Sequence, residues 1–414
     1  MKIFQLNFSD INGGAARAAY RIHHALRANG VDSTFLSNVA TAGDWTVQAP
    51  TNKAAKAWGR VRPQLGVLPT KLLRTGNPII HSPSILPSGR VQALNASDAD
   101  LLHLHWVQGE MLSVADIGRL KKPVVWTLHD MWAFCGAEHV AWDERWREGY
   151  RANNRPAYES GFDLNRWTWT RKRKHWQRPM HIVTPSRWLA DCVGESSLMC
   201  DWPVTVVPNC LDTERWQPLE KSLARQLLGL PVDIQLIMFG SYGANAAHHK
   251  GFDLLLQALA HLRGEMPVLN LVVFGQLAPR NPPDLGFPIH YTGHLHDDLS
   301  LRALYSAADA LVIPSRQDNL PNTGVEALAC GTPVVAFNTG GLPDIVDHQQ
   351  TGYLAKAFEA EDLAQGIQWV LADAERLSGL RVLARQTAVA RFSNAVVAEK
   401  YKAVYDEAIR ANSA

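Results

Sequence analysis

The fold is decided by one stretch of the chain, Pro314-Ser-Arg-Gln-Asp-Asn-Leu-Pro-Asn-Thr-Gly-Val-Glu-Ala-Leu-Ala-Cys-Gly331. It follows the apolar run from Ala310 to Ile313, which predicts a buried strand, and it ends in the helical pattern from Thr323 to Cys330. A buried strand, a polar loop and a helix in that order form part of a βαβ unit, the building block of parallel sheets. The stretch therefore predicts an α/β protein.

The amino end of this helix predicts an anion site. Backbone N–H groups of the first turn point out of a helix at the positive end of its dipole, where a diphosphate binds. Asp318 precedes the helix and Glu326 lies about one turn inside it, so the two carboxylates can bind a sugar hydroxyl and the paired ribose hydroxyls of one ligand. Either acid alone is equally well explained as a helix-capping or exposed side chain. The four residues of the first turn are Asn322, Thr323, Gly324 and Val325.

Outward from this stretch, short apolar runs alternate with helical patterns along the chain, which is typical of parallel sheets. In the first half we expect strands at Lys2–Phe8, Leu101–His105, Val124–His129, His181–Thr184 and Val204–Val207. In the second half we expect them at Gln235–Phe239, Leu271–Phe274, Ile289–Thr292, Ala310–Ile313 and Pro333–Phe337. Helices are expected near residues 15–29, 251–263, 297–308, 323–330 and 394–410.

The chain length predicts two domains. Its 414 residues exceed the size at which a single hydrophobic core stops growing. We place an N-terminal Rossmann-like domain at residues 1–210 and a C-terminal one at 211–393. The final helix, 394–414, is expected to return to the first domain, because Val397, Tyr401, Val404 and Ala408 give it one apolar face.

Composition excludes several classes of protein. No stretch approaches the roughly 20 apolar residues of a membrane span, and the first residues lack the pattern of a signal peptide. The five cysteines are odd in number and lack paired spacing, which argues against a disulfide framework and a structural zinc site. The cysteines fit a reducing cytoplasm, where we expect the protein. We do not expect it to bind nucleic acid, because the chain outside residues 145–178 has no basic stripe and no recognisable binding module.

One segment is strongly basic. Residues 145–178 contain ten Lys or Arg against three acids, a local charge of +7, together with Trp146, Trp167, Trp169 and Trp176. The segment can be a solvated face whose tryptophans are half buried in a core. Alternatively, it can contact anionic lipid at the inner face of the cytoplasmic membrane or an acidic, lipid-linked acceptor.

The stretch from Pro314 to Gly331 resembles the signature of the retaining family 4 glycosyltransferases, in which two glutamates eight positions apart lie in a P-S…E-A-x-A-x-G frame. Here the first acid is Asp318. The resemblance extends to a Gly-Gly loop near the N-terminus and to four further motifs. These are Thr127-Leu-His-Asp130, Pro208-Asn209 before Asp212, Lys250-Gly251 and Gly340-Gly-Leu-Pro-Asp-Ile-Val346.

The resemblance implies the GT-B fold, in which two Rossmann-like domains face each other across a cleft and the final helix crosses back. It implies a nucleotide-sugar donor on the C-terminal domain and an acceptor on the N-terminal domain. Many members of the family build bacterial cell-surface polysaccharides. Retaining transfer from a nucleoside-diphosphate sugar to a hydroxyl of a lipid-linked or oligosaccharide acceptor is therefore the expected activity.

The resemblance also assigns catalytic roles. His129 would orient the donor sugar, and Lys250 would place an ammonium beside the leaving diphosphate. Asp318 and Glu326 complete the expected catalytic set. Gly13 and Gly14 would bind the donor, because a glycine lets the backbone approach a ligand closely.

The sequence leaves open which residue supplies a second positive charge in the donor site. Where the family often has an arginine after the first strand of the donor domain, this chain has Ser241 in a longer loop. Ser241 and Arg316 are therefore candidate donor-binding residues, and His249 or Lys250 alone could also cover the phosphates.

A metal is not expected. Asp98-Ala-Asp100 resembles a metal-binding D-x-D, but it precedes the apolar run Leu101 to His105 and fits the start of a strand. The histidines at 103, 105, 248 and 249 lack acidic or cysteine partners at a suitable spacing. We expect transfer without metal or cofactor, by front-face displacement.

Two other interpretations remain. The chain could be a nucleotide-sugar epimerase or a phosphorylase with the same pair of domains. It could also be a non-catalytic subunit that binds sugar nucleotides, which the departures from the family pattern at Asp318, Ser241 and Cys210 keep open.

Overall fold

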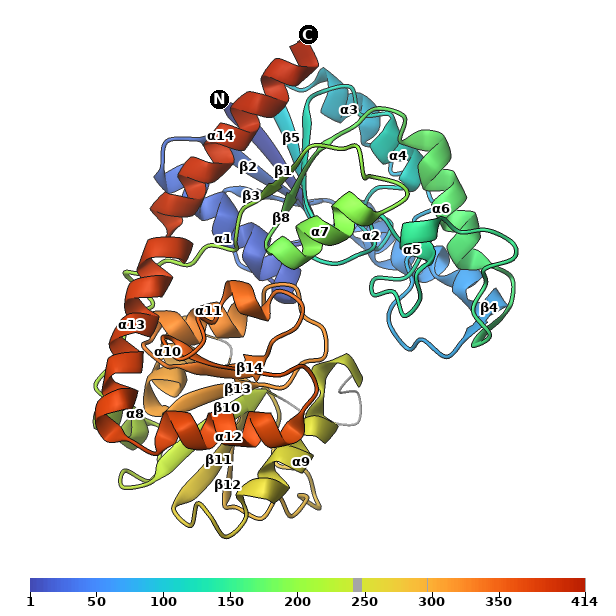
Figure 1. The fold of residues 1–414 in the computed structure, drawn as a ribbon. Helices are drawn as coiled ribbons and strands as arrows, with labels where there is room; N and C mark the ends of the chain where they lie inside the picture. Colours follow the sequence, from blue (N-terminus) through green and yellow to red (C-terminus); the bar gives the residue numbers. More distant parts are fainter. Residues whose placement is uncertain (241–247, 296, 414) are drawn as a thin grey trace. The chain divides into compact units, whose positions relative to one another are not determined.

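The computed structural model describes residues 1–240, 248–295 and 297–413 (Figure 1). The chain divides into two compact units. The first contains Met1–Cys210 together with Val397–Ala414, and the second contains Leu211–Val396. The acceptor and donor roles expected for them stay predictions.

The first unit is built on a parallel sheet. In chain order its strands are β1 (Lys2–Ser9), β2 (Asp32–Val39), β3 (Val47–Gln48), β5 (Leu101–Leu104), β6 (Val124–Thr127), β8 (His181–Thr184) and β9 (Val204–Val206). Their order across the sheet is β3-β2-β1-β5-β6-β8-β9. The register sets Gln5 of β1 beside Phe35 of β2 on one side and His103 of β5 on the other.

Side chains alternate between the two faces of this sheet. Ile3, Leu101 and Val125 pack with α1 (Gly14–Ala28) and with the last helix, α14 (Asn394–Ser413). Leu102, Leu104 and Trp126 pack on the opposite face. The helices there are α3 (Val91–Ala96), α4 (Val114–Gly118), α6 (Leu164–His175) and α7 (Arg187–Glu195).

Further short elements lie between β3 and β8. They are α2 (Lys53–Gly66), the 3₁₀ helix η1 (Leu68–Leu72), β4 (Leu73–Thr75), α5 (Arg145–Glu148) and β7 (Glu159–Gly161). β4 and β7 pair antiparallel, so η1 and the start of α6 are brought to the same region of the unit.

The second unit contains another parallel sheet. Its strands are β10 (Gln235–Gly240), β11 (Leu269–Phe274), β12 (Ile289–Gly293), β13 (Ala310–Ile313), β14 (Val334–Phe337) and β15 (Gly352–Ala355). The order across the sheet is β12-β11-β10-β13-β14-β15. This is the Rossmann order, in which the chain reverses direction across the sheet between β10 and β13.

Helices cover both faces of the second sheet. Ile237, Val273 and Val335 pack with α9 (Phe252–Leu262) and α12 (Ala360–Leu371). Met238, Val272 and Val334 pack in a second core on the other face. The helices there are α8 (Lys221–Leu227), α10 (Asp298–Ala307), α11 (Asn322–Ala329) and α13 (Ala374–Phe392).

The last helix belongs to the first unit from Val397 onward. Tyr401 and Tyr405 are fully buried against the sheet, a burial worth about 1.5–3 kcal/mol for each large side chain. The hydroxyl of Tyr405 lies 2.8 Å from Nδ1 of His103, and that of Tyr401 lies 3.0 Å from Oγ1 of Thr127. These contacts join the C-terminal helix to β5 and β6.

Candidate active site

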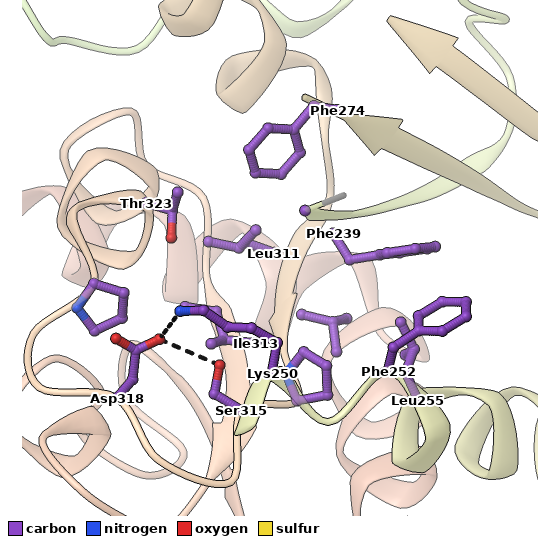
Figure 2. A pocket seen from close by; sticks show the side chains of 14 residues that line it. Phe239, Lys250, Phe252, Leu255, Phe274, Leu311, Ile313, Ser315, Asp318 and Thr323 are labelled. Atoms are coloured by element: carbon purple, nitrogen blue, oxygen red, sulfur yellow. Dashed lines mark hydrogen bonds and ion pairs between the residues drawn. The ribbon is translucent and has the colours of Figure 1, made fainter. Parts of the chain in front are cut away.

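A cavity of about 250 Å³ opens at the carboxyl edge of the second sheet (Figure 2). It lies where the strand order reverses between β10 and β13, which is where open α/β sheets bind their ligands. Apolar side chains such as Phe239, Phe252 and Phe274 form much of its wall. The polar and loop residues that line it are Gly240, Lys250, Pro314, Ser315, Asp318, Pro321 and Thr323.

Lys250 and Asp318 meet in this cavity. Nζ of Lys250 lies 2.6 Å from Oδ2 of Asp318, and the same oxygen accepts a hydrogen bond from the hydroxyl of Ser315 at 3.2 Å. The Lys250 side chain is 48% exposed, so its ammonium remains accessible to a ligand. The structure thus brings together two of the four expected catalytic residues.

Two glycines explain how these loops approach each other. At Gly251, with φ +65°, a Cβ would lie 1.9 Å from the carbonyl oxygen of Pro314. At Gly340, with φ +56°, a Cβ would lie 2.5 Å from the carbonyl oxygen of Asp318. A side chain at Gly251 would push the Lys250 segment away from Pro314, and one at Gly340 would push the segment after β14 away from Asp318.

Arg316 is held beside the cavity rather than in it. Its guanidinium donates to both carboxylate oxygens of Asp253 in the first turn of α9, at 2.7 and 2.6 Å. Its backbone N–H donates to the carbonyl oxygen of His249 at 2.7 Å. Hydrogen bonding to Asp253 raises the pKa of Arg316. Arg316 therefore fastens the Pro314 loop to the Lys250 loop, and Ser241 lies outside the described residues.

Glu326 and the first turn of α11 are less exposed than their predicted roles suggest. Glu326 is buried, and its Oε2 accepts a hydrogen bond from the hydroxyl of Tyr305 at 2.9 Å. The N–H of Gly324 donates to the carbonyl oxygen of Pro321 at 3.0 Å. A Cβ at Gly324 would lie 3.0 Å from Ile345, so this glycine permits close packing. Asn322 and Thr323 are partly exposed, and Val325 is buried.

A second cavity, of about 260 Å³, opens in the first unit at the equivalent reversal of strand order. It lies between the end of β1 and the start of α1 and is lined by Gly13, Gly14 and Trp106. Gly13 has φ 97° and caps the amino end of α1. The structure therefore places the two predicted glycines at a cavity.

His129 ends a buried chain of polar side chains. Its Nε2 lies 3.2 Å from Nδ1 of His105, whose Nε2 lies 2.9 Å from Oε1 of Gln5. Nε2 of Gln5 donates to Oγ of Ser33 at 3.0 Å. Burial lowers the pKa of His129 to about 4, so the ring is neutral at pH 7.

The chain continues from Ser33 to a carboxylate. Oγ of Ser33 lies 2.8 Å from Nδ1 of His23, whose Nε2 lies 2.9 Å from Oγ1 of Thr46. The Thr46 hydroxyl donates to Oδ1 of Asp44 at 2.7 Å. Although burial acts to raise the pKa of Asp44, hydrogen bonds from Thr46, Tyr20 and His24 hold it well below its ordinary value.

The carboxylate fixes the direction of every hydrogen bond in this chain, because an ionised carboxylate only accepts. Thr46 must donate to Asp44, so His23 donates from Nε2 to Thr46 and accepts at Nδ1 from Ser33. Gln5 then donates to Ser33 and accepts from Nε2 of His105, which leaves Nδ1 of His105 as an acceptor. His129 therefore carries its proton on Nε2, and its Nδ1 is an acceptor.

Asp130 follows His129 in the chain, and hydrogen bonds hold its carboxylate in place. It accepts hydrogen bonds from Nε1 of Trp106 at 3.2 Å and from the backbone of Trp132 at 2.9 Å, and lies 2.6 Å from Nδ1 of His139. Burial acts to raise the pKa of Asp130, but His139 lowers it below the ordinary value. Asp130 therefore links Trp106, at the Gly13 cavity, to the loop after β6.

Two family models match the chain. The model described as Glycosyltransferase Family 4 matches residues 12–215, and the model described as Glycosyl transferases group 1 matches residues 234–373. The first match lies largely in the first unit and the second match within the second unit. The chain belongs to glycosyltransferase family 4. This confirms the resemblance read from the Pro314 stretch.

Curated relatives of this family 4 chain carry glycosyltransferase names. D-inositol 3-phosphate glycosyltransferase of Segniliparus rotundus is 32% identical over 217 residues, which are 50% of this chain and 47% of that protein. MMP alpha-(1->4)-mannosyltransferase of Mycolicibacterium hassiacum is 28% identical over 337 residues, 78% of this chain and 74% of that protein. The matched part spans about half the length of the inositol-phosphate enzyme.

Solved structures confirm the predicted GT-B fold. Sucrose-phosphate synthase from Thermosynechococcus elongatus matches with a TM-score of 0.67 at 18% identity, covering 99% of this chain and 100% of that one. Anabaena HepE, in complex with UDP and glucose, matches with a TM-score of 0.64 at 18% identity, covering 98% and 100%.

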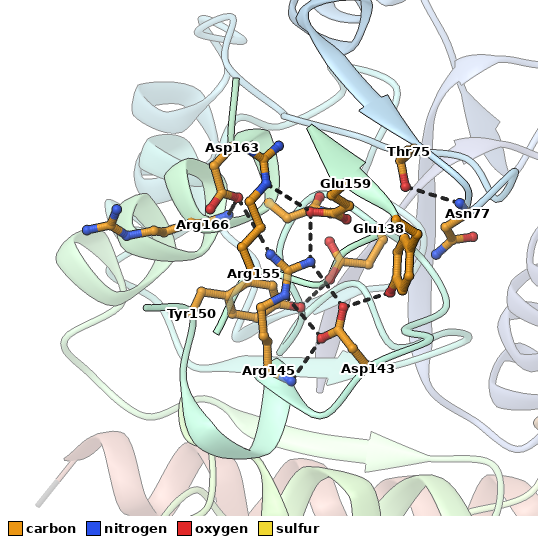
Figure 3. A network of polar contacts seen from close by, with 12 residues as sticks. Thr75, Asn77, Glu138, Asp143, Arg145, Tyr150, Arg155, Glu159, Asp163 and Arg166 are labelled. Carbon is orange, nitrogen blue, oxygen red and sulfur yellow. Dashed lines mark hydrogen bonds and ion pairs between the residues drawn. The ribbon is translucent and has the colours of Figure 1, made fainter. Parts of the chain in front are cut away.

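In the basic segment of the family 4 chain, residues 145–178, one arginine lies in a network of polar contacts (Figure 3). Arg145 is buried and contacts Asp143, Glu159 and Asp163 at 3.1, 3.0 and 3.6 Å. Three of its four tryptophans are buried, the exception being Trp167. Six of its ten basic side chains are exposed, namely Arg147, Arg151, Arg166, Arg173, Lys174 and Arg178. The membrane contact expected for this segment stays a prediction.

Lys172, from the same segment, is also buried. Its ammonium donates to the backbone carbonyls of Trp132, Cys135 and Gly136, and lies 3.7 Å from the ring centroid of Trp132. Burial lowers the pKa of Lys172 to about 7. The Lys172 side chain therefore packs and forms hydrogen bonds within the first unit.

The Asp98-Ala-Asp100 pair anchors the start of β1. Nζ of Lys2 lies 2.6 Å from Asp98, and the backbone N–H of Lys2 donates to Asp100 at 2.7 Å. Within residues 1–240, 248–295 and 297–413, no three His, Cys, Asp or Glu side chains are grouped to hold a metal ion. None of the helices in these ranges is long and apolar enough to cross a bilayer.

Sequence reasoning missed several residues that shape the donor site. Asp253 holds Arg316, Tyr305 binds Glu326, and Phe274 lines the cavity. Asp253 could have been found from its place in the first turn of α9, two residues after Gly251. Tyr305 and Phe274 carry no local signal, because only the fold brings them to the cavity and Glu326.

Proposed function

We propose that the chain transfers a sugar from a nucleoside-diphosphate sugar to an acceptor hydroxyl with retention of the anomeric configuration. The observation that carries this proposal is the Lys250–Asp318 pair, 2.6 Å apart, in the cavity at the strand reversal of the second sheet. Membership of glycosyltransferase family 4 supports it.

The donor is proposed to bind with its diphosphate beside Lys250 and the first turn of α11. The half-exposed ammonium can bind a phosphate oxygen, and a helix amino end favours a negative charge. Asp318, on the other side of the ammonium, is proposed to bind a hydroxyl of the transferred sugar. Glu326 is proposed to contribute to ribose binding, with Tyr305 fixing the orientation of its carboxylate.

The proposed reaction is a front-face displacement that uses no metal. The acceptor hydroxyl attacks the anomeric carbon on the side from which the diphosphate leaves, and the leaving phosphate takes the proton. The chain's own contribution is electrostatic: Lys250 stabilises the negative charge that develops on the diphosphate. His129, with Nδ1 as an acceptor, is proposed to hold a sugar hydroxyl that donates to it.

The acceptor is proposed to bind at the first unit. A hydroxyl of a lipid-linked or oligosaccharide acceptor in cell-surface polysaccharide synthesis is the proposed class. The reaction would take place in the cytoplasm, at the inner face of the membrane for a lipid-linked acceptor. The glycosyltransferase names of the relatives support a sugar-transfer role.

A thermal-shift panel of UDP-, GDP-, ADP- and dTDP-sugars tests the donor proposal. The UDP-sugars come first because Anabaena HepE was solved with UDP and glucose. A specific donor at a hundred times its Kd stabilises the native state by about 2.7 kcal/mol. Failure of every sugar nucleotide to stabilise the protein would contradict the proposal.

Proton NMR of the product tests the mechanism. With an α-linked donor we expect an α-linked product at a rate that EDTA does not change. An inverted product would contradict retention, and a rate lost on chelation would contradict the metal-free reaction. An epimerised sugar nucleotide, a reaction with free phosphate, or binding without turnover would instead favour the epimerase, the phosphorylase or the non-catalytic subunit.

A further inference from the structure

The segment between β3 and β5 has an unusual charge. Residues 45–97 contain seven Lys or Arg and no Asp or Glu. This region supplies α2 and η1 in the first unit. Its net charge of +7 equals that of residues 145–178.

Helix α2 is scarcely packed against the rest of the unit. Of its 14 residues only Arg62 and Gly66 are buried. Arg62 fastens the helix by donating to the carbonyl oxygens of Leu86, Pro87 and Glu110 at 2.8 to 3.2 Å. A helix this short is marginal in water without tertiary packing. Its unpacked face is therefore available to a partner.

That face is apolar. Trp58, Val61 and Leu65 recur at i, i+3 and i+7, which places them on one stripe of the helix. They are 52%, 42% and 39% exposed. Leu68 and Leu72 of η1 extend the apolar surface and are 48% and 61% exposed.

Two further aromatic side chains join this surface. Phe162 follows β7, and its N–H donates to the carbonyl oxygen of Leu72 at 2.9 Å. The ring of Trp167, in α6, packs edge-on against that of Phe162 with centroids 6.0 Å apart. Both rings remain exposed. We call these seven exposed side chains the α2 surface: Trp58, Val61, Leu65, Leu68, Leu72, Phe162 and Trp167.

Cations accompany the α2 surface. Lys53, Lys56 and Arg60 follow the same i, i+3, i+7 spacing, displaced by five residues from the apolar stripe, or about 140° around the helix. All three are exposed, as are Lys71 and Arg74 beside Leu72. The helix therefore has an apolar stripe and a basic stripe on different sides.

We propose that the α2 surface is a membrane-docking site for anionic lipid head groups. A helix with aromatic and aliphatic residues on one side and Lys or Arg on the other binds in the plane of a bilayer interface. The acid-free sequence from 45 to 97 provides the charge complementarity, because anionic head groups attract its exposed cations and it contains no acid that would repel them. The inference does not depend on the transfer reaction.

Vesicle flotation of the full chain tests this proposal. We expect binding to vesicles of phosphatidylcholine with phosphatidylglycerol, little binding to phosphatidylcholine alone, and weaker binding at high salt. The variant Lys53→Gln/Lys56→Gln/Arg60→Gln should bind about a hundredfold more weakly, since three charges near the surface are lost. Its matched control, Lys356→Gln/Lys400→Gln/Arg410→Gln, removes the same charge elsewhere and should bind as the wild type does.

An apolar pair of variants completes the test. Trp58→Gln/Leu65→Gln/Leu68→Gln should lose vesicle binding, whereas Leu227→Gln/Leu277→Gln/Val382→Gln, which changes exposed side chains of the second unit, should keep it. Thermal unfolding checks that each variant is folded. A wild type that ignores anionic vesicles, or α2 variants that bind as well as the wild type, would overturn the proposal. So would a dimer in solution that only the α2 variants dissociate, because a second copy would then cover the surface.

Discussion

Glu326 differs from the other three expected catalytic residues because it is buried, with only 3% of the residue exposed. We predict that Glu326→Ala lowers the free energy of unfolding by about 1–3 kcal/mol as well as reducing transfer, because the buried hydroxyl of Tyr305 loses this acceptor. Urea denaturation measures the loss. Glu326→Gln keeps an acceptor oxygen and should recover most of the stability. An Ala variant as stable as the wild type would contradict the account.

His129 gives a second prediction for a single residue. The hydrogen-bond chain that ends at Asp44 requires the proton of His129 on Nε2. Nitrogen NMR of ¹⁵N-histidine protein should show this tautomer, with the resonance assigned by loss in His129→Gln. Thr46→Val interrupts the chain and should broaden or shift the resonance, whereas Thr46→Ser should restore it. A His129 protonated on Nδ1 would show that the chain runs otherwise.

Sequence reasoning succeeded for residues whose motif fixes a place in the chain. Lys250 and Asp318 were expected at one site because each follows a strand of the same sheet, and the structure brings them together. The sequence did not predict which partner a side chain would bind. Arg316 precedes Asp318 by two positions, yet it is bound to Asp253, because the partner comes from another element.

At the scale of elements, α14 is held by specific polar contacts as well as by apolar burial. We predict that Tyr405→Phe destabilises the protein by about 1–3 kcal/mol, because the buried Nδ1 of His103 loses its partner 2.8 Å away. Denaturation by urea is the measurement. Tyr353→Phe is a matched control, since the partly exposed hydroxyl it removes donates to Asp362. Equal effects in the two variants would contradict this role of Tyr405.

All ten predicted strands are present, with ends shifted by at most two residues. β2 was missed although it lies next to the central strand β1, because its sequence Asp32-Ser-Thr-Phe-Leu-Ser-Asn-Val39 is largely polar. Ser33 and Ser37 are buried there because they form hydrogen bonds, Ser33 with Gln5 and Ser37 with Val39. An apolar pattern cannot reveal a strand whose buried side chains are polar and paired. β15 is only four residues long and was also missed.

At the scale of the whole molecule, buried neutral histidines make stability depend on pH. Burial lowers the pKa of His23 to about 3, against 6.5 for an ordinary histidine. Below pH 6.5 the unfolded chain binds a proton that the native chain does not, so stability is full above pH 6.5 and falls as the pH drops toward 3.

We predict that this residue alone removes about 2 kcal/mol between pH 7 and pH 5. Urea denaturation at the two pH values measures the difference. Between these pH values the free energy of unfolding of His23→Gln should fall by about 2 kcal/mol less than that of the wild type. His261→Gln, at an exposed position, should behave as the wild type does. A wild type whose stability rises from pH 7 to pH 5 would contradict the assignment.

The two units share one design, a parallel sheet whose strand order reverses beside a cavity. The central claim is that the cavity of the second unit binds the diphosphate of the donor through Lys250. Isothermal titration of the nucleoside diphosphate of the accepted donor tests it most directly. We predict that Lys250→Ala binds at least about tenfold more weakly than the wild type, because a charge-assisted contact is lost, with an unchanged melting temperature. Equal affinities in the two proteins would contradict the claim.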